Sequence, residues 1–211
     1  MSHRETTHTV SPPYASPGGT WARREWIRAA IGVPAVAGLA ATASPADDYS
    51  WIRGANYVPS YATTDVETWL HYDPDVIERE LGYAERLKLN SLRVFLQYLV
   101  WEHDPESFMA NLEDFVTRCA RRGIRPMLVL FDSCFGTDPS LESSGFWVAN
   151  PGPSRMHRDF WPQVERYARD VVGHFRGDGR VLFWDVMNEP QATWLMADDE
   201  GKRAVWEFCL H

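Results

Sequence analysis

The stretch with the clearest chemical content is FWDVMNEP, residues 183–190, in which an apolar run ends in Asn188, Glu189 and Pro190. The run has the composition of a buried strand, and a proline at its end cannot continue the hydrogen-bond ladder. The pattern therefore places an amide and a carboxylate at the carboxyl end of a strand, where parallel α/β folds bind their ligands.

A carboxylic acid in that position suits the hydrolysis of a glycosidic bond, because this reaction needs a proton on the leaving oxygen. Such an acid works best when desolvation in an apolar cleft raises its pKa toward neutrality. We therefore expect Glu189 to act as the acid and Asn188 to donate a hydrogen bond to a sugar hydroxyl. Side chains alternate along a strand, so both can face one site only if the backbone bends between them.

The rest of the chain from Trp51 onward alternates strand patterns with helix patterns. Asp73 before Pro74 predicts the start of a helix, as Asp104 does further on, and Gly123 predicts a helix end. We expect strands over 51–58, 91–100, 125–131 and 180–187, and helices over 73–89, 105–123 and 158–177, with a further loop and helix over 190–211.

Nearly continuous apolar strands are typical of a parallel sheet covered on both faces, and crossovers of this length are right-handed. An open doubly wound sheet and a closed eight-stranded barrel both fit this order. A nucleotide-binding open sheet should have a glycine-rich turn after its first strand, whereas this chain has VPSY at 58–61 and no GxGxxG or GxxxxGK[ST] motif. The sequence therefore argues against a nucleotide-binding open sheet, and the residues alone leave the choice between the two architectures open.

Aromatic residues follow three successive predicted strands. Tyr57 comes after the first, Tyr98 and Trp101 after the second, and Trp147 after the third. Aromatic faces at the carboxyl ends of strands suit the apolar faces of sugar rings, so we expect these four to line a binding cleft. Each of them taken singly is as well explained by packing within the loops.

The segment WDVMNEP, preceded by three strand–helix units, resembles the fourth strand of clan A glycoside hydrolases, most closely family 5. RGANYVP at the first strand and SLRVFLQ at the second strengthen the resemblance, which covers about residues 50–210. It implies a (β/α)8 barrel that cleaves β-linked glycans such as xylan, cellulose or mannan with retention. It also implies that Glu189 is the acid/base, that Asn188 binds the sugar beside the cleaved bond, and that Arg93 keeps the nucleophile ionised.

Apart from the family resemblance, the sequence itself predicts an anionic partner for Arg93, because an arginine inside an apolar strand needs one. The sequence departs from the family pattern at the end of the third strand, where family 5 members usually have a histidine and this chain reads LFDS. We expect Asp132 in that segment to contact substrate.

The nucleophile of the family lies on the seventh strand, and an eight-stranded barrel takes roughly 250 residues. Without its first 46 residues the chain has 211 − 46 = 165, so we expect residues 47–211 to be half a barrel. Asp132, Asp185 and Glu102 are the internal alternatives for the nucleophile, with Asp185 expected at the barrel floor. A half-barrel would leave two open sheet edges, which predicts self-association and little activity for the isolated chain.

Three functions remain open from the sequence: a glycoside hydrolase, a non-catalytic carbohydrate-binding remnant of one, and a structural or regulatory α/β protein. The net charge of −8 argues against a nucleic-acid partner. Seven histidines and three cysteines lack the spacing of a metal site, and hydrolysis by this route needs no cofactor.

The N-terminus predicts an export signal. Residues 23–28, RREWIR, precede a charge-free run over 29–43 and resemble a twin-arginine signal, although Ala22 stands where Ser or Thr is usual. The run of 15 residues is shorter than the roughly 20 that span a bilayer. We expect residues 1–46 to be removed and the mature protein to be periplasmic or secreted without a membrane segment; an uncleaved anchor is the alternative.

Overall fold

The computed structural model describes residues 48–134, 138–190 and 199–211. A compact unit extends over Asp48–His211, and the predicted leader over 1–46 lies outside the described residues. Four strands form one parallel sheet in the order β1-β2-β3-β4. The α/β fold class predicted from the sequence is confirmed, because each strand is joined to its parallel neighbour through helices.

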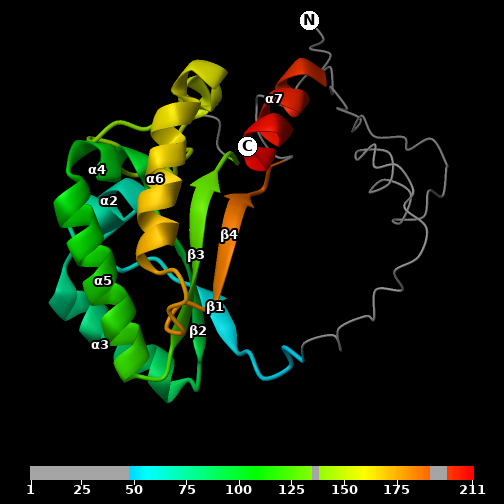
Figure 1. The fold of residues 1–211 in the computed structure, drawn as a ribbon. Helices are drawn as coiled ribbons and strands as arrows, with labels where there is room; N and C mark the ends of the chain where they lie inside the picture. Colours follow the sequence, from blue (N-terminus) through cyan, green and yellow to red (C-terminus); the bar gives the residue numbers. More distant parts are fainter. Residues whose placement is uncertain (1–47, 135–137, 191–198) are drawn as a thin grey trace, which may run out of the picture. The chain divides into compact units, whose positions relative to one another are not determined.

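The strands are β1 Gly54–Asn56, β2 Ser91–Phe95, β3 Arg125–Asp132 and β4 Phe183–Asn188. The helices between them are α2 Asp65–Leu70, α3 Pro74–Arg86, α4 Tyr98–His103, α5 Pro105–Arg121 and α6 Trp161–His174, with two short 3₁₀ turns over Pro153–Met156 and Arg158–Phe160. A last helix, α7, covers Asp199–Leu210. Figure 1 shows α2 to α6 gathered on one side of the sheet, and α7 near the carboxyl ends of β3 and β4.

The two long helices α3 and α5 form where their capping residues predict. The Asp73 side chain accepts hydrogen bonds from the backbone N–H groups of Asp75 and Val76, and Asp104 caps α5 through Ser107 N–H. Gly123, after the end of α5, has a φ of +68°, a conformation that costs glycine little. These caps fix where each helix begins and ends, and therefore where the following strand starts.

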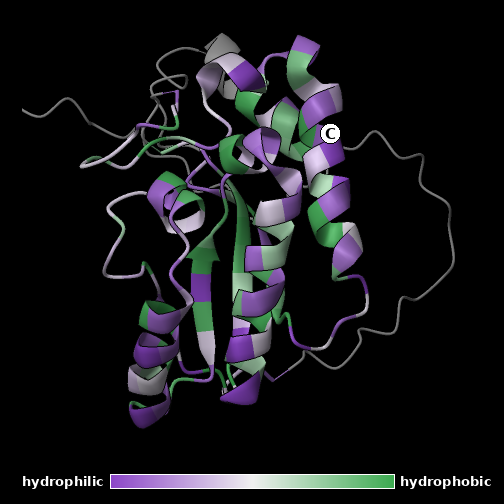
Figure 2. Ribbon diagram, turned by 90° about the vertical axis from the view of Figure 1, so that its left-hand side faces the viewer, coloured by the Kyte–Doolittle hydropathy of each residue, from purple (hydrophilic) through white to green (hydrophobic). Residues whose placement is uncertain are grey.

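The core lies between the sheet and the helices. Its largest fully buried side chains include Trp69, Tyr98, Phe108, Phe115 and Tyr167. Trp69 is also anchored by a hydrogen bond of 2.7 Å from its indole N–H to the carbonyl oxygen of Phe95. Figure 2 shows the strands as mainly hydrophobic, while the helices carry both hydrophobic and hydrophilic residues. The packed face of the sheet thus fixes the positions of the strand ends.

The second strand is shorter than the apolar run over 91–100 predicts. It ends at Phe95, and the Gln97 side chain then accepts the backbone N–H of Leu99, which starts α4. Tyr98 and Trp101 therefore belong to a helix and not to a strand-end loop. The first strand is also shorter than predicted, with three residues paired to β2.

Candidate active site

The carboxyl end of β4 positions the two residues that the sequence selects. Asp132 of β3 is the register partner of Asn188, so the ends of β3 and β4 lie level. Glu189 follows with a φ of +46°, a left-handed conformation uncommon for a residue with a side chain. This bend lets Asn188 and Glu189 serve one site in spite of the alternation of side chains along a strand.

The amide of Asn188 is held at both of its polar atoms. Its Oδ1 accepts a hydrogen bond of 2.9 Å from Nη2 of Arg93, and its Nδ2 donates one of 3.1 Å to Oδ1 of Asp132. An amide nitrogen carries two hydrogens, so one donor remains for a ligand. The two partners also fix which end of the amide is the donor.

Arg93 has the anionic partner that its place in β2 predicts. Its Nη2 lies 2.5 Å and its Nε 3.0 Å from Oδ2 of Asp185, and both side chains are 24% exposed. The guanidinium also lies over the Phe95 ring, at 4.7 Å from the ring centroid. Arg93 thus connects the carboxylate of Asp185 to the amide of Asn188 on one side of the sheet.

Asp132 is 1% exposed, and donors surround its carboxylate. The Cys134 N–H donates to Oδ1 at 2.8 Å, and the Trp147 indole N–H donates to Oδ2 at 2.8 Å. Burial raises the pKa of Asp132, against the lowering effect of these donors and of Asn188, and the Glu189 carboxylate adds to the rise. A carboxylate held by three donors is suited to orienting its neighbours.

Trp147 comes from the long loop after β3 and is half-buried. Besides its bond to Asp132, its ring meets the ring of Phe95 edge to face, with centroids 5.2 Å apart. Glu189 is exposed, so the described residues do not form the desolvating cleft that the sequence predicts around it. The structure therefore brings Arg93, Asp132, Trp147, Asn188 and Glu189 to one end of the sheet.

Three predicted binding residues lie elsewhere, which corrects the expectation that they line the cleft. Tyr57 turns toward the helices, where its hydroxyl donates to Glu80 at 2.9 Å and its ring stacks on Phe115. Tyr98 and Trp101 are buried in α4, and both pack against Tyr167 of α6. Their rings contribute to the core and are not free to stack on a sugar.

Asn150, in the same loop as Trp147, was not selected from the sequence. It is 1% exposed, and its Nδ2 donates to the carbonyl oxygens of Leu96 and Leu130 at 2.8 and 2.7 Å. Its Oδ1 accepts the backbone N–H of Tyr98 at 2.9 Å, and its backbone pairs with that of Asp132. Asn150 therefore ties the loop to the ends of β2 and β3, which places Trp147 beside Asp132.

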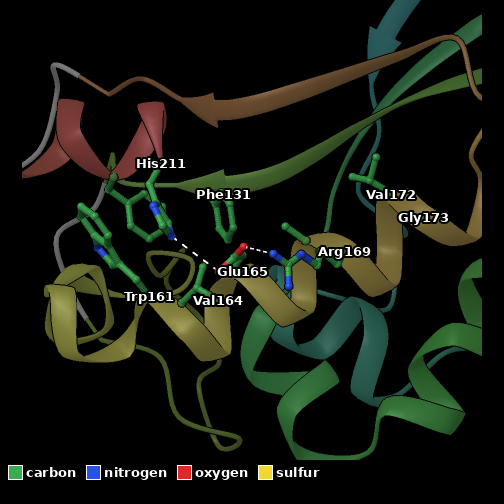
Figure 3. Close-up of a pocket in the computed structure, with 10 residues that line it drawn as sticks. Phe131, Trp161, Val164, Glu165, Arg169, Val172, Gly173 and His211 are labelled. Carbon is green, nitrogen blue, oxygen red and sulfur yellow. Dashed lines mark hydrogen bonds and ion pairs between the residues drawn. The ribbon is translucent and has the colours of Figure 1, made fainter.

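Two cavities among the described residues lie away from this group. One of about 400 Å³ is lined by Tyr98, Trp101, Glu102 and residues of α6. Another of about 470 Å³ lies between α6, α7 and Phe131, with Trp161 and His211 stacked at one end (Figure 3). None of the five residues at the sheet end lines either cavity.

Two further observations concern metals and membranes. Within 48–134, 138–190 and 199–211, no three or more His, Cys, Asp or Glu side chains are grouped so as to hold a metal ion. No helix in that same part of the chain has the length and apolar character needed to cross a membrane.

No protein-family model and no curated protein sequence matches the chain. Among solved structures it is similar to the exo-beta-1,4-mannosidase Op5Man5 from Opitutaceae bacterium strain TAV5, with a TM-score of 0.55 and 24% identity over 74% of this chain. It is also similar to GH5_18 from Streptomyces cattleya in complex with GlcNAc (TM-score 0.50, 18% identity, 74% of this chain). A third similar structure is that GH5_18 protein with a substitution, in complex with Manb1-4GlcNAc (TM-score 0.51, 18% identity, 74% of this chain).

The chain spans 28% of the length of the mannosidase and 40% and 41% of the two Streptomyces structures. Likeness at this identity concerns the fold. The four parallel strands with their helices therefore match part of the (β/α)8-barrel fold of these proteins.

Proposed function

We propose that this chain carries the acid/base part of a site that hydrolyses β-glycosidic bonds. The observation that carries the proposal is the arrangement of Asn188 and Glu189 at the carboxyl end of β4, with the amide held between Arg93 and Asp132. An exposed carboxylate beside an oriented amide donor, on a barrel-type sheet, suits proton transfer to a bound sugar.

In the first step of this proposal, the protonated Glu189 gives its proton to the glycosidic oxygen while the bond from the sugar carbon to that oxygen breaks. In the second step, the Glu189 carboxylate takes a proton from the attacking water, which restores the acid. The free amide hydrogen of Asn188 donates to a sugar hydroxyl next to the cleaved bond. Trp147, fixed by Asp132 and Phe95, offers a ring face to the sugar.

Retention of configuration requires a second carboxylate about 5 Å from the acid. Asp132 does not suit this role, because donors already occupy both of its oxygens. Asp185 is bound to Arg93, and Glu102 accepts the Tyr98 hydroxyl beside the cavity of about 400 Å³. The proposal therefore takes the nucleophile from outside the described residues.

For the substrate we propose a β-linked glycan or oligosaccharide of the mannan, glucan or xylan type. The resemblance of the fold to an exo-beta-1,4-mannosidase supports a glycan of the mannan type.

The second candidate function is binding of the same glycans without turnover. The lack of a free second carboxylate near Glu189 among the described residues favours it.

The test is an assay of β-1,4-linked manno-, gluco- and xylo-oligosaccharides for both binding and release of reducing ends. It should use the gene product that contains this chain, in parallel with the 211 residues alone. Hydrolysis by the gene product supports the proposed glycosidase activity. If both proteins bind the oligosaccharides and neither cleaves them, the result supports glycan binding without turnover. If neither protein binds or cleaves any of the three, the proposed function is wrong.

We also propose export by the twin-arginine route. Replacing Arg23 and Arg24 by lysine should leave the protein in the cytoplasm, because such a signal depends on the arginine pair. The measurement is fractionation of cells that carry either form, followed by detection of the protein in each fraction. Equal export of both forms would contradict this expectation.

The 211-residue chain expressed by itself should self-associate. The outer edges of β1 and β4 have no pairing strand among the described residues, and Val186 of β4 is 48% exposed. Unpaired backbone groups beside exposed apolar side chains favour pairing with a second copy. Size-exclusion chromatography with light scattering checks this, and a monomer that unfolds cooperatively would contradict it.

A further inference from the structure

The turn that follows β3 holds the residues at the end of β4 at several points. Ser133 donates its backbone N–H to the Asn188 carbonyl oxygen and its hydroxyl to the Glu189 carbonyl oxygen, both at 3.4 Å. Cys134 contacts the side chain of Glu189, with its Sγ 3.1 Å from Oε2 of that carboxylate. The Cys134 backbone is itself fixed by its N–H bond to Asp132. A single turn thus contacts both the backbone and the side chain of Glu189.

We propose that Cys134 is a positioning residue for the Glu189 carboxyl group, an inference that rests on the proposed function and deepens it. The thiol hydrogen is directed at Oε2, so this oxygen acts as an acceptor. Oε1 is then the oxygen that carries the transferable proton, and the thiol decides which way the acid faces. The left-handed backbone of Glu189 is uncommon for a residue with a side chain, and the thiol contact adds a side-chain tether to the backbone bond from Ser133.

A thiol can fill this role only if it stays protonated. Burial raises the pKa of the Cys134 thiol to about 12, and the neighbouring carboxylates of Glu189 and Asp132 contribute to the rise. At neutral pH the group is therefore a donor and a poor nucleophile. This electrostatic setting argues for a hydrogen-bonding role and against a reactive one.

The other two cysteines provide internal references. Burial alone raises the pKa of Cys209 to about 11, and this side chain is half-buried in α7. Cys119 lies fully buried in the core and should react only when the protein unfolds. Because one chain contains all three thiols, their alkylation rates can be compared within a single sample.

The decisive test measures the alkylation rate of each cysteine by iodoacetamide, using mass spectrometry, in the 211-residue chain and in its Glu189→Gln variant. Removing the negative charge should raise the thiolate fraction of Cys134 and speed its alkylation at least severalfold, with Cys209 unchanged. An unchanged Cys134 rate would overturn the proposal. Faster reaction of Cys119 would reveal unfolding, and the comparison then moves to Glu189→Asp, in which the carboxylate keeps its charge but withdraws by one methylene, so a smaller acceleration of Cys134 is expected and an unchanged rate would again overturn the proposal.

A second test asks whether the contact serves the proposed reaction. Cys134→Ala should lower turnover of poorly activated glycosides by about tenfold, the value of one hydrogen bond, with a smaller loss on activated aryl glycosides. Cys134→Ser keeps a donor and should restore most of the loss. Equal losses in both variants on both substrates would mean a merely structural role. If the unmodified protein cleaves nothing, the proposed function fails, while the alkylation rates still decide whether the contact exists.

Discussion

Replacing Glu189 by glutamine should lower the hydrolysis of poorly activated glycosides by about 10²- to 10⁴-fold, the usual contribution of a general acid. Glutamine has nearly the same shape but cannot donate the proton that the leaving oxygen needs. Aryl glycosides with strongly acidic leaving groups need little protonation, so their first step should be affected much less. Steady-state kinetics on one substrate of each kind measures the difference.

The control is Glu142→Gln, which makes the same chemical change at an exposed glutamate in the loop after β3. It should leave both rates close to those of the unmodified protein. Equal losses on the two substrates in Glu189→Gln would indicate a binding role for the residue, and full activity on oligosaccharides would exclude it as the acid.

Asn150→Ala should destabilise the fold by about 3–5 kcal/mol, because it removes three hydrogen bonds from buried backbone groups. The carbonyl oxygens of Leu96 and Leu130 and the backbone N–H of Tyr98 would each lose a hydrogen bond of 2.9 Å or shorter. The loop that carries Trp147 would also lose its attachment to β2 and β3. Urea denaturation, followed by circular dichroism, gives the change in the free energy of unfolding.

Gln163→Ala serves as the control for this measurement, since Gln163 is exposed on α6 and its loss should change stability by less than about 0.5 kcal/mol. A loss below about 1 kcal/mol in Asn150→Ala would mean that water replaces the amide and that the loop does not depend on it.

The helices and the parallel sheet were predictable because their signals are local. Asp73 with Pro74 and Asp104 with Pro105 begin α3 and α5 as predicted. The apolar run over 91–100 misled the prediction, because periodicity alone does not separate a buried strand from a short buried helix. Gln97, which caps α4, is the local signal that the strand ends before it and that a helix begins after it.

The candidate site was predictable where it depends on strand ends and on charge. The rule that functional residues gather at the carboxyl ends of strands selected Asp132, Asn188 and Glu189, and the need of Arg93 for an anion pointed to an acidic partner. Asp185 on β4 is that partner, although the sequence pointed to it only as an alternative nucleophile at the barrel floor.

The supporting contacts were not predictable, because they join residues far apart in the chain. Asn150 bonds to Leu96 and Tyr98, more than 50 residues earlier, and Cys134 reaches Glu189 across 55 residues. No local pattern marks such pairs. The predicted binding role of the aromatic residues was wrong for a different reason. An aromatic ring can pack in a hydrophobic core as well as against a sugar, and the sequence does not separate the two. In this fold Tyr57, Tyr98 and Trp101 pack against other residues of the protein.

The central claim is that Glu189 is the acid/base of a retaining glycosidase, and azide rescue tests it most directly. In Glu189→Ala, assayed in the gene product that contains this chain, a small anion can enter the space that the carboxylate leaves and attack the glycosyl intermediate without needing a general base. With an activated aryl β-glycoside, added azide should raise turnover and yield the β-glycosyl azide. No acceleration by azide, or an azide product of inverted configuration, would contradict the account.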